Sequence, residues 1–426
     1  IQKLNGEPGA NRYIISNSED IFAVLNVYGL FKFCGWKDDE ISMDIIPLFE
    51  TIKGLSNARE VMDRLYKLPI YTRHLKRRNQ KQTIMLGFSD GTKDGGYLKA
   101  NWEIFNAKER LSQVSAENGI KVIFFDGRGG PPARGGGKTN RFYAAQGKNI
   151  ANNEIQLTIQ GQTVTSMYGT IEQFMHNCEQ LITAGISNDI FDDEKNKFSF
   201  EERALMNELA NISYQKYEAL KQHPKFVPYL EKMSTLKYYG KANIGSRPAK
   251  RGNKKQLTLS DLRAISFVGS WSQLKQNVPG YFGIGTAIRE LKNQGRIEEV
   301  KQLFENQAFF KTLILNSMMS LTKTFFPLTA YMKDNPEFGE FWEILHTEYQ
   351  LSKELMFEIT GYSELMQEEP LSKTSVEFRE KMVLPLLTIQ QYALQKIAAN
   401  DKQRATYEKM VMRSLYGNIN ASRNSA

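Results

Sequence analysis

The feature that most restricts the possible folds is an alternation of short apolar runs with helical patterns in the first part of the chain. Residues 41–49, 83–88 and 120–125 are apolar runs of strand length. Between the last two runs, residues 95–116 repeat apolar side chains every three or four positions, as one face of a helix does. This β-α-β-α-β order predicts an α/β fold built on parallel strands, in an open sheet or a barrel.

The remaining sequence predicts few strands and many helices. Residues 154–166 are interpreted as a hairpin that turns at Gln160-Gly161. Residues 263–268 are interpreted as one more short strand, which follows a basic loop. From Glu290 to the end, only helical patterns occur. No stretch has the composition of a linker, so we expect one compact unit.

Polar residues follow the predicted strands at comparable places. Glu50 follows the first strand, Asp90 follows the second, and Asp126 and Arg128 follow the third. In barrels of parallel strands, the residues at the carboxyl ends of the strands converge on one site. Two carboxylates there suit a hard cation such as Mg²⁺ or Mn²⁺, which prefers oxygen ligands. The alternative is that Glu50 and Asp90 cap the helices that follow them.

The most unusual segment runs from Asp126 to Lys138 and has the sequence DGRGGPPARGGGK. Its glycines allow the backbone to approach a ligand closely, and its arginines can bind phosphate or carboxylate through paired hydrogen bonds. The segment lacks the spacing of the common nucleotide-binding loops. The alternative is a disordered RNA-binding segment rich in Arg and Gly. Because the segment directly follows a predicted strand, we favour an ordered loop that binds phosphate.

The charge of the chain indicates an anionic partner. Its 426 residues carry a formal net charge of +9, and the pI is about 9.2. Nucleic acid, a membrane surface or a small phosphorylated substrate would each fit this charge. A second basic cluster, residues 245–255, is typical of a solvated loop when it is taken alone.

The two cysteines suggest no disulfide framework, and no apolar run has the length of a membrane span. We therefore expect a cytoplasmic protein.

Six motifs together resemble the phosphoenolpyruvate carboxylase family. They occur in the order of that family and at similar spacing, and the resemblance runs from about Asn11 to Ala426. The motifs are PLFET (Pro47 to Thr51), GFSDGTKDGG (Gly87 to Gly96), GRGG and RGGG (within Gly127 to Gly137), FVPY (Phe226 to Tyr229), GSRPAKR (Gly245 to Arg251) and LRAI (Leu262 to Ile265).

The resemblance implies a fold. The family has a (β/α)8-type parallel barrel, of which this chain would hold the later strands, and a large all-helical carboxyl-terminal portion. We therefore expect the barrel strands and active-site loops in residues 1–285 and the helical region in residues 286–426. The amino-terminal half of the family's catalytic domain is expected to be missing, and the full-length enzyme is expected to be a homotetramer.

The resemblance also implies an activity. The family joins bicarbonate to phosphoenolpyruvate and releases oxaloacetate and phosphate, an anaplerotic reaction that feeds the tricarboxylic acid cycle. The family's catalytic histidine and one of its substrate-binding arginines belong to the half that this chain lacks. We therefore expect the chain alone to be inactive, and we expect neither nucleic acid nor a membrane as its partner.

The resemblance assigns roles to individual residues. Glu50 and Asp90 match the family's ligands for Mg²⁺ or Mn²⁺, and Lys93 matches a lysine beside the metal. The arginines that bind phosphoenolpyruvate and carboxyphosphate fall on Arg128, Arg247 and Arg263.

Feedback inhibition by a dicarboxylate is a further expectation from the family. The site for aspartate or malate matches Arg134, Lys323, Arg379 and Asn424. Two guanidinium groups, an ammonium and an amide are suitable partners for two carboxylates. Because all four residues are present, we expect such a ligand to inhibit the enzyme.

The chain departs from the family pattern at several positions. The family usually has histidine at the position of Asp126, and a carboxylate there would repel bicarbonate unless another group neutralises it. A second usual histidine is replaced by Asn140, and a usual arginine by Lys275.

The basic loop from Lys250 to Leu257 is expected to close over the site and exclude water.

Two other kinds of function stay open on the sequence alone. A nucleic-acid-binding protein would present a continuous basic face with aromatic platforms and no carboxylates near Arg128. A regulatory remnant would bind aspartate without catalysis.

Overall fold

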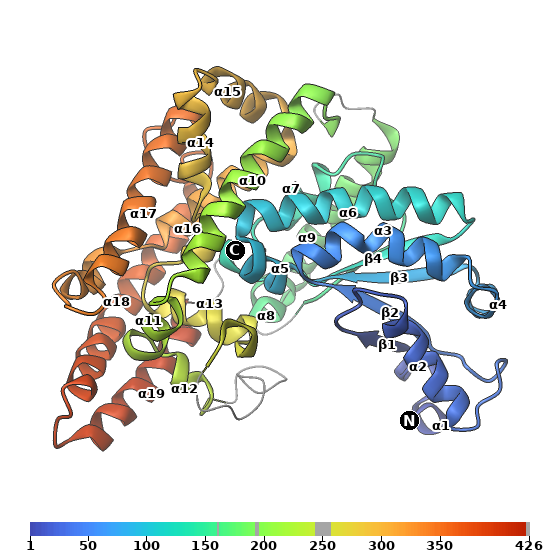
Figure 1. Cartoon of the computed structure of the whole chain (residues 1–426), viewed down its shortest axis with the longest axis horizontal. Helices are drawn as coiled ribbons and strands as arrows, with labels where there is room; N and C mark the ends of the chain where they lie inside the picture. The colour runs from blue at the N-terminus through green and yellow to red at the C-terminus, as the bar shows by residue number, and fades with distance from the viewer. Residues whose placement is uncertain (160–161, 192–195, 243–256, 423–426) are drawn as a thin grey trace.

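The computed structural model describes residues 1–159, 162–191, 196–242 and 257–422. At its centre is a sheet of five parallel strands, flanked by helices (Figure 1). The strands are β1 (Arg12–Ile15), β2 (Asp44–Phe49), β3 (Lys81–Leu86), β4 (Lys121–Asp126) and β5 (Ile155–Leu157). The three strands that the apolar runs predict are confirmed as β2, β3 and β4, whereas β1 was not predicted.

The order of the sheet is β1-β2-β3-β4-β5, so each strand pairs in parallel with the next one in the chain. Such an order occurs in open sheets and in barrels alike. Among the described residues, neither β1 nor β5 pairs with a further strand at the edge of the sheet. The α/β class with a parallel sheet is confirmed, and the closed barrel stays a prediction.

The predicted hairpin at residues 154–166 is wrong. Its first part is β5, which pairs in parallel with β4, and its second part is the helix α8 (Gln162–Tyr168). The proposed turn at Gln160-Gly161 lies outside the described residues. A two-stranded hairpin has little independent stability, whereas a strand that joins the edge of an existing sheet gains a ready partner.

The predicted strand at residues 263–268 is also wrong, because these residues begin the helix α13 (Ala264–Gln273). Phe267 and Trp271, one turn apart, are both buried and pack around Phe226. A short apolar run does not distinguish a buried strand from a buried helix, and here both sides of the helix are covered.

The other helices have the following bounds. In the first part of the chain they are α1 (Gln2–Asn5), α2 (Phe22–Phe33), α3 (Ile52–Tyr66), α4 (Pro69–Arg77), α5 (Phe88–Gly95), α6 (Tyr97–Glu117), α7 (Thr139–Ala144) and α9 (Ile171–Ile190). Beyond residue 196 they are α10 (Phe200–Gln222), α11 (Phe226–Met233), α12 (Leu236–Tyr239), α14 (Ile284–Asn293), α15 (Ile297–Asn306), α16 (Ala308–Thr322), α17 (Gly339–Thr360), α18 (Pro370–Ala398) and α19 (Arg404–Ser422).

Helices α3 and α6 lie along one face of the sheet (Figure 1). Alternate side chains of β4 face this layer, since Val122 and Phe124 are buried in the same cluster as residues of α3 and α6. The neighbouring Phe125 is only half-buried on the other face. On the other face of the sheet, Ile46 and Ile123 are buried too.

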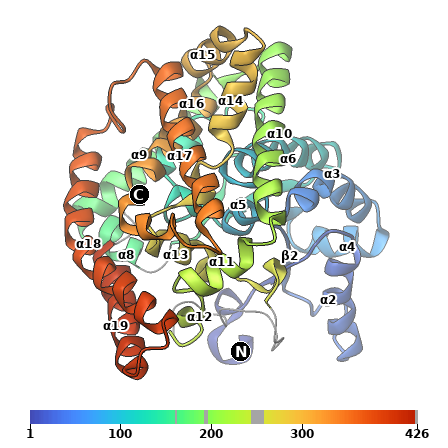
Figure 2. The same cartoon turned by 60° about the vertical axis from the view of Figure 1, so that its left-hand side comes forward.

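Helices α14 to α17 form a second layer beyond α10, and α18 packs against α19 at the side of the molecule away from β1 (Figures 1 and 2). One hydrophobic cluster joins both layers. Within it, Phe105 of α6 and Phe309 of α16 have ring centroids 4.5 Å apart. The sheet and the helical region thus share a core.

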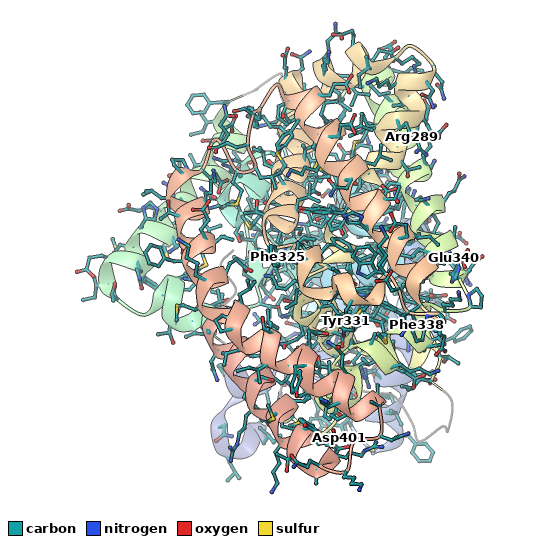
Figure 3. All side chains as sticks on the ribbon, turned by 90° about the vertical axis from the view of Figure 1, so that its left-hand side faces the viewer. Arg289, Phe325, Tyr331, Phe338, Glu340 and Asp401 are labelled. Carbon is teal, nitrogen blue, oxygen red and sulfur yellow. The ribbon has the colours of Figure 1, made fainter. Side chains whose placement is uncertain are left out.

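Figure 3 shows the helical side of the molecule, with Arg289 on α14 near one end and Asp401 at the turn between α18 and α19. Tyr331, between α16 and α17, donates a hydrogen bond of 3.0 Å to Gln391 of α18. In the described part of the chain, no helix has both the length and the apolar character that crossing a bilayer requires.

Candidate active site at the carboxyl edge of the sheet

The carboxyl ends of three strands are level with one another. The Gly87 amide, just after β3, donates to the Phe49 carbonyl of β2 at 2.9 Å. The Gly127 amide, just after β4, donates to the Leu86 carbonyl of β3 at 2.9 Å. These bonds continue the parallel ladder by one residue, so the residues that follow β2, β3 and β4 lie side by side.

Glu50 lies at this edge and is 9% exposed. A Cβ atom placed on Gly87 would lie 2.5 Å from the Cβ of Glu50, so only glycine fits beside it. Asp90 lies in the first turn of α5, directly before Gly91, and a Cβ on Gly91 would lie 3.8 Å from the Glu50 carbonyl oxygen. The structure therefore brings the two predicted metal ligands to one edge.

The capping alternative does not hold for Glu50. The helix after β2 is capped by Thr51, whose hydroxyl accepts from the Gly54 amide at 2.9 Å. The first amide of that helix, at Ile52, donates to Asp94 at 2.9 Å. Asp90 is not an N-cap either, because that position belongs to Gly87.

Arg134 lies beside Asp90. Burial lowers the pKa of Arg134, and the Asp90 carboxylate acts in the opposite direction. The Ser89 hydroxyl donates to the Arg134 carbonyl at 3.1 Å. Gly135 has a φ of +77°, and a Cβ there would lie 2.7 Å from the Phe88 carbonyl oxygen. The glycine loop from Asp126 to Lys138 therefore packs directly across the start of α5.

Lys93 joins α5 to the start of α13. Its ammonium donates to the Leu262 carbonyl at 2.6 Å. The next residue, Arg263, is the N-cap of α13. This hydrogen bond keeps Arg263 close to the last turn of α5, where Lys93 lies.

Arg128 follows β4 and is 4% exposed. Its guanidinium donates to the Gly137 carbonyl at 3.2 Å and to the Thr139 hydroxyl at 3.0 Å. It also lies 4.5 Å from the centre of the Phe142 ring. Burial is the main cause that lowers the pKa of Arg128. The side chain lines a small cavity of about 40 Å³ together with Thr158.

The glycine loop is ordered and anchored rather than free. The Lys138 amide donates to Asn316 at 3.2 Å, and Asn316 donates to the Tyr97 hydroxyl at 2.9 Å. Tyr97 in turn donates to the Gly136 carbonyl at 3.2 Å. This packing contradicts the alternative of a disordered RNA-binding segment.

Comparison with known proteins shows the family of the chain. A sequence model described as phosphoenolpyruvate carboxylase matches residues 1–422. The chain belongs to the phosphoenolpyruvate carboxylase family. It is 33% identical over 412 residues to the phosphoenolpyruvate carboxylase of Corynebacterium efficiens, covering 94% of this chain and 44% of that protein.

Other relatives give the same result. The phosphoenolpyruvate carboxylase of Nitrosomonas europaea is 32% identical over 440 residues, which cover 100% of this chain and 47% of that protein. The one of Prochlorococcus marinus is 33% identical over 423 residues, which cover 95% and 43%. The chain thus spans about half the length of the phosphoenolpyruvate carboxylases that it matches.

The negative charge of Asp126, which the resemblance did not lead us to expect, is offset by two neighbouring side chains. The carboxylate is 0% exposed and pairs with the Lys108 ammonium at 2.6 Å. The Tyr143 hydroxyl also donates to it. The sequence analysis missed Lys108 and Tyr143. The available signal was the place of Lys108 between Ile104 and Leu111 on the apolar face of the helix.

Two of the residues that we expect to bind a dicarboxylate, Lys323 and Arg379, lie in a basic cluster. Burial lowers the pKa of Lys323 to about 7, and the charges of Lys275, Arg379 and Lys138 act in the same direction. Glu380 acts in the opposite direction and pairs with Lys275. For Arg134, burial lowers the pKa, and the charges of Asp90 and Tyr239 oppose this shift.

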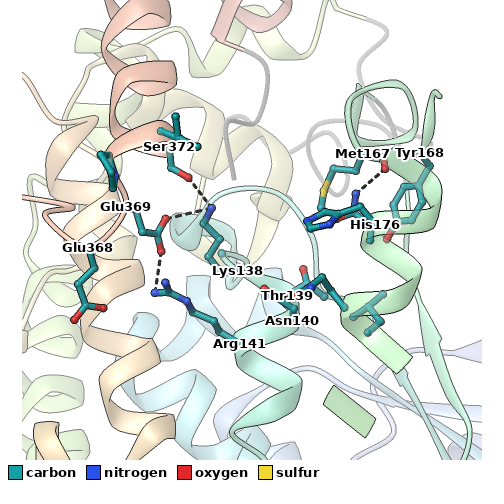
Figure 4. Close-up of a pocket in the computed structure, with 16 residues that line it drawn as sticks. Lys138, Thr139, Asn140, Arg141, Met167, Tyr168, His176, Glu368, Glu369 and Ser372 are labelled. Atoms are coloured by element: carbon teal, nitrogen blue, oxygen red, sulfur yellow. Dashed lines mark hydrogen bonds and ion pairs between the residues drawn. The ribbon is translucent and has the colours of Figure 1, made fainter. Parts of the chain in front are cut away.

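A cavity of about 400 Å³ lies between the end of the glycine loop and the start of α18 (Figure 4). Across it, Lys138 contacts Glu369 at 3.2 Å and donates to Ser372 at 2.7 Å, and Arg141 contacts Glu369 at 3.0 Å (Figure 4). Asn140 lines the same cavity. The glycine loop is therefore tied to the helix that carries Arg379.

Several predicted residues lie outside the described part of the chain. They are Arg247, Asn424 and all but the last residue of the loop from Lys250 to Leu257. Among the described residues, no group of three or more His, Cys, Asp or Glu side chains could hold a metal ion. The two carboxylates of Glu50 and Asp90 fit Mg²⁺ none the less, because this ion commonly takes one or two carboxylates and completes its shell with water and substrate phosphate.

Proposed function

We propose that the chain is the carboxyl-terminal half of an enzyme that joins bicarbonate to phosphoenolpyruvate to give oxaloacetate and phosphate. The proposal is carried by the meeting of Glu50, Asp90 and the glycine loop at one edge of the sheet, in a member of this family. The relatives at about twice its length are phosphoenolpyruvate carboxylases by name. The anaplerotic role, the cytoplasmic location and a homotetrameric assembly belong to the same proposal.

Glu50 and Asp90 would hold Mg²⁺ or Mn²⁺. Bound there, the ion would supply Lewis-acid stabilisation for the negative oxygen that develops on the substrate. Lys93, whose ammonium is fixed at the Leu262 carbonyl, adds a positive charge near this edge.

The arginines would offset the charge of the phosphoryl group and orient it. Bicarbonate oxygen attacks the phosphorus of phosphoenolpyruvate, and the bond from phosphorus to the enol oxygen breaks. Carboxyphosphate and the enolate of pyruvate result. Carboxyphosphate then releases CO₂ and phosphate, and the enolate carbon attacks CO₂. Arg128, Arg263 and Arg247 are the residues proposed for binding the phosphoryl group.

The decisive experiment is to express the protein from its complete reading frame and to measure oxaloacetate and phosphate release. Asp90→Asn removes one charge at the proposed metal site and should lower turnover at least about a hundredfold. Asp63→Asn is the matched control, since Asp63 pairs with Lys67 at 2.6 Å on the outside of α3. Turnover that survives Asp90→Asn at the level of Asp63→Asn would reject the metal site. The chain of residues 1–426 by itself should show no turnover.

A second candidate function is a regulatory remnant that binds a dicarboxylate such as aspartate or malate. The nearness of Lys323, Arg379 and Lys275 to one another favours this ligand, because basic side chains are suitable partners for two carboxylates. In the first candidate the same ligand acts as an inhibitor, with Arg134 and Asn424 as further proposed partners. Dicarboxylate binding without any bicarbonate-dependent turnover in the protein from the complete reading frame would favour the remnant.

A further inference from the structure

We infer that Asp126, Lys108 and Tyr143 form a positioning unit that sets the place of Arg128 through the short helix α7. The inference deepens the proposed function and rests on it, because it assumes that Arg128 binds the phosphoryl group. None of the three residues touches the substrate in this scheme.

The first observation is the complete burial of the unit. Lys108 is 1% exposed and Asp126 is 0% exposed. Burial lowers the pKa of Lys108, and the Asp126 carboxylate opposes this shift. A buried charge needs both a partner and further hydrogen bonds. Asp126 finds the partner in Lys108 and the further bond in the Tyr143 hydroxyl.

The second observation is that α7 depends on side chains for its place. It has six residues, and its N-cap, Lys138, makes no side-chain capping bond. A helix of this length is not stable without tertiary contacts. Near its end, Tyr143 is fastened to Asp126, the last residue of β4.

The third observation is that α7 holds Arg128. The Thr139 hydroxyl accepts from the guanidinium at 3.0 Å, and the ring of Phe142 lies under it at 4.5 Å. Phe142 and Tyr143 are neighbours, so a shift of Tyr143 away from Asp126 moves the ring on which Arg128 rests. The end of β4 thus positions Arg128 in two ways. Arg128 follows β4 directly in the chain, and α7, which is bonded to the last residue of β4, contacts the Arg128 side chain.

The ion pair between Lys108 and Asp126 also affects the charge around Arg128. The positive charge of Arg128 is a minor cause that lowers the pKa of Lys108, whose main cause is burial. The Asp126 carboxylate neutralises Lys108, so the charge that remains next to the small cavity is that of Arg128. A phosphoryl group would therefore meet one oriented cation, and both bonds that offset the negative charge of Asp126 go to its Oδ2 atom.

The first test is Tyr143→Phe in the protein expressed from its complete reading frame. This variant keeps the ring and removes the hydrogen bond to Asp126. We expect the KM for phosphoenolpyruvate to rise about tenfold while kcat changes less than about twofold, because binding geometry is lost rather than chemistry. Tyr66→Phe is the matched control, since its buried hydroxyl bonds to Ser115 at 3.0 Å on another part of α6. It should lower stability similarly and leave the KM unchanged.

The second test is a double-mutant cycle with Arg128→Lys. If the unit acts through Arg128, Tyr143→Phe should add little further loss of kcat/KM in the Arg128→Lys background. A large effect of Arg128→Lys, combined with a Tyr143→Phe variant that behaves like Tyr66→Phe, would overturn the inference and leave the proposed function standing. No effect of Arg128→Lys on either constant would overturn both the inference and the role proposed for Arg128, while the measured turnover would still support the carboxylation.

A third variant covers the case in which Tyr143→Phe does not fold. Lys108→Met combined with Asp126→Leu removes the ion pair as a whole and leaves no lone charge in the core. It should fold and raise the KM for phosphoenolpyruvate as Tyr143→Phe is expected to do. A folded double variant with an unchanged KM would contradict the positioning role.

Discussion

Lys323 shows how a charged residue takes its properties from its neighbours. It lies at the end of α16, where the Asn277 amide donates to its carbonyl at 2.9 Å. Burial and the nearby Lys275 and Arg379 all favour its neutral form. With a pKa of about 7, its charge is lost within the physiological range.

A pH dependence of the proposed dicarboxylate inhibition follows from this value. A lysine with a lowered pKa is charged below about pH 7 and neutral above it, so the affinity should fall as the pH rises. We expect malate to inhibit about tenfold more weakly at pH 8.5 than at pH 6.5. Malate is the suitable probe because both of its carboxylates stay ionised over this range.

The matched variant for this prediction is Lys323→Arg, which keeps the positive charge at every pH. Its inhibition by malate should change much less between the two pH values. Equal pH dependence in the variant and in the unchanged protein would show that another group titrates.

At the residue scale, the sequence is most informative about residues whose location in the fold follows from their place directly after a strand. Glu50 and Asp90 could be predicted to meet because they follow neighbouring parallel strands. Lys108 and Tyr143 could not be assigned to Asp126, because they come from two different helices and meet it only through packing. A lysine on an apolar helix face indicates a buried partner, but its identity requires the fold.

The end of β3 shows how an element positions a functional residue. Gly87 is the N-cap of α5, and its hydrogen bond to the Phe49 carbonyl brings α5 against β2. Its φ of −92° is accessible to any residue, so the glycine is required for space and not for backbone conformation.

Gly87→Ala should therefore act through a collision. The new methyl group would meet the Cβ of Glu50, and the end of β2 would have to move. We expect a loss of about 1–3 kcal/mol in the free energy of unfolding, measured by denaturant titration. The weaker hold on Glu50 should also raise the Mg²⁺ concentration needed for activity.

The control is the same substitution at Gly29 on the exposed face of α2, where a Cβ would meet no atom within 4 Å. Gly29→Ala should stabilise by about 0.5–1 kcal/mol, because alanine favours the helix. If Gly87→Ala lowered the free energy of unfolding no more than Gly29→Ala does, the close contact between Glu50 and Gly87 would be contradicted.

At the element scale, long and strongly periodic segments could be predicted, and short ones could not. The helix expected at residues 95–116 is α6, within two residues at either end. The segments at 154–166 and 263–268 were misassigned because their few apolar residues fit either period. Their final structure depends on the edge of β4 in one case and on the aromatic side chains around Phe226 in the other.

On the scale of the molecule, an apolar surface lies beside β5. Ile182 and Ile186 on α9 are 60% and 50% exposed. Together with Ile155 and Leu157 of β5, they line a cavity of about 630 Å³. Monomers seldom expose a contiguous apolar surface of this kind, and within the part of the chain that the structure describes β5 pairs with β4 alone.

The chain expressed alone should therefore self-associate. Sedimentation velocity should show a mass that increases with protein concentration. Ile182→Lys combined with Ile186→Lys should reduce this dependence, because two charges would have to be buried in the contact. Leu30→Lys, at an equally exposed residue on α2, should not. A chain that stays monomeric over the whole concentration range would contradict the prediction.

The order of the sheet has a consequence for the time course of synthesis. Because each strand pairs with the one made just before it, a nascent chain can add strands in the order in which they leave the ribosome. The shared hydrophobic cluster, however, includes Ile359, roughly 230 residues after the end of β4. At about 5–20 residues per second, the paired strands wait about 10–50 s for the helices that complete their core. During that interval, a cellular chaperone has its best opportunity to bind this protein.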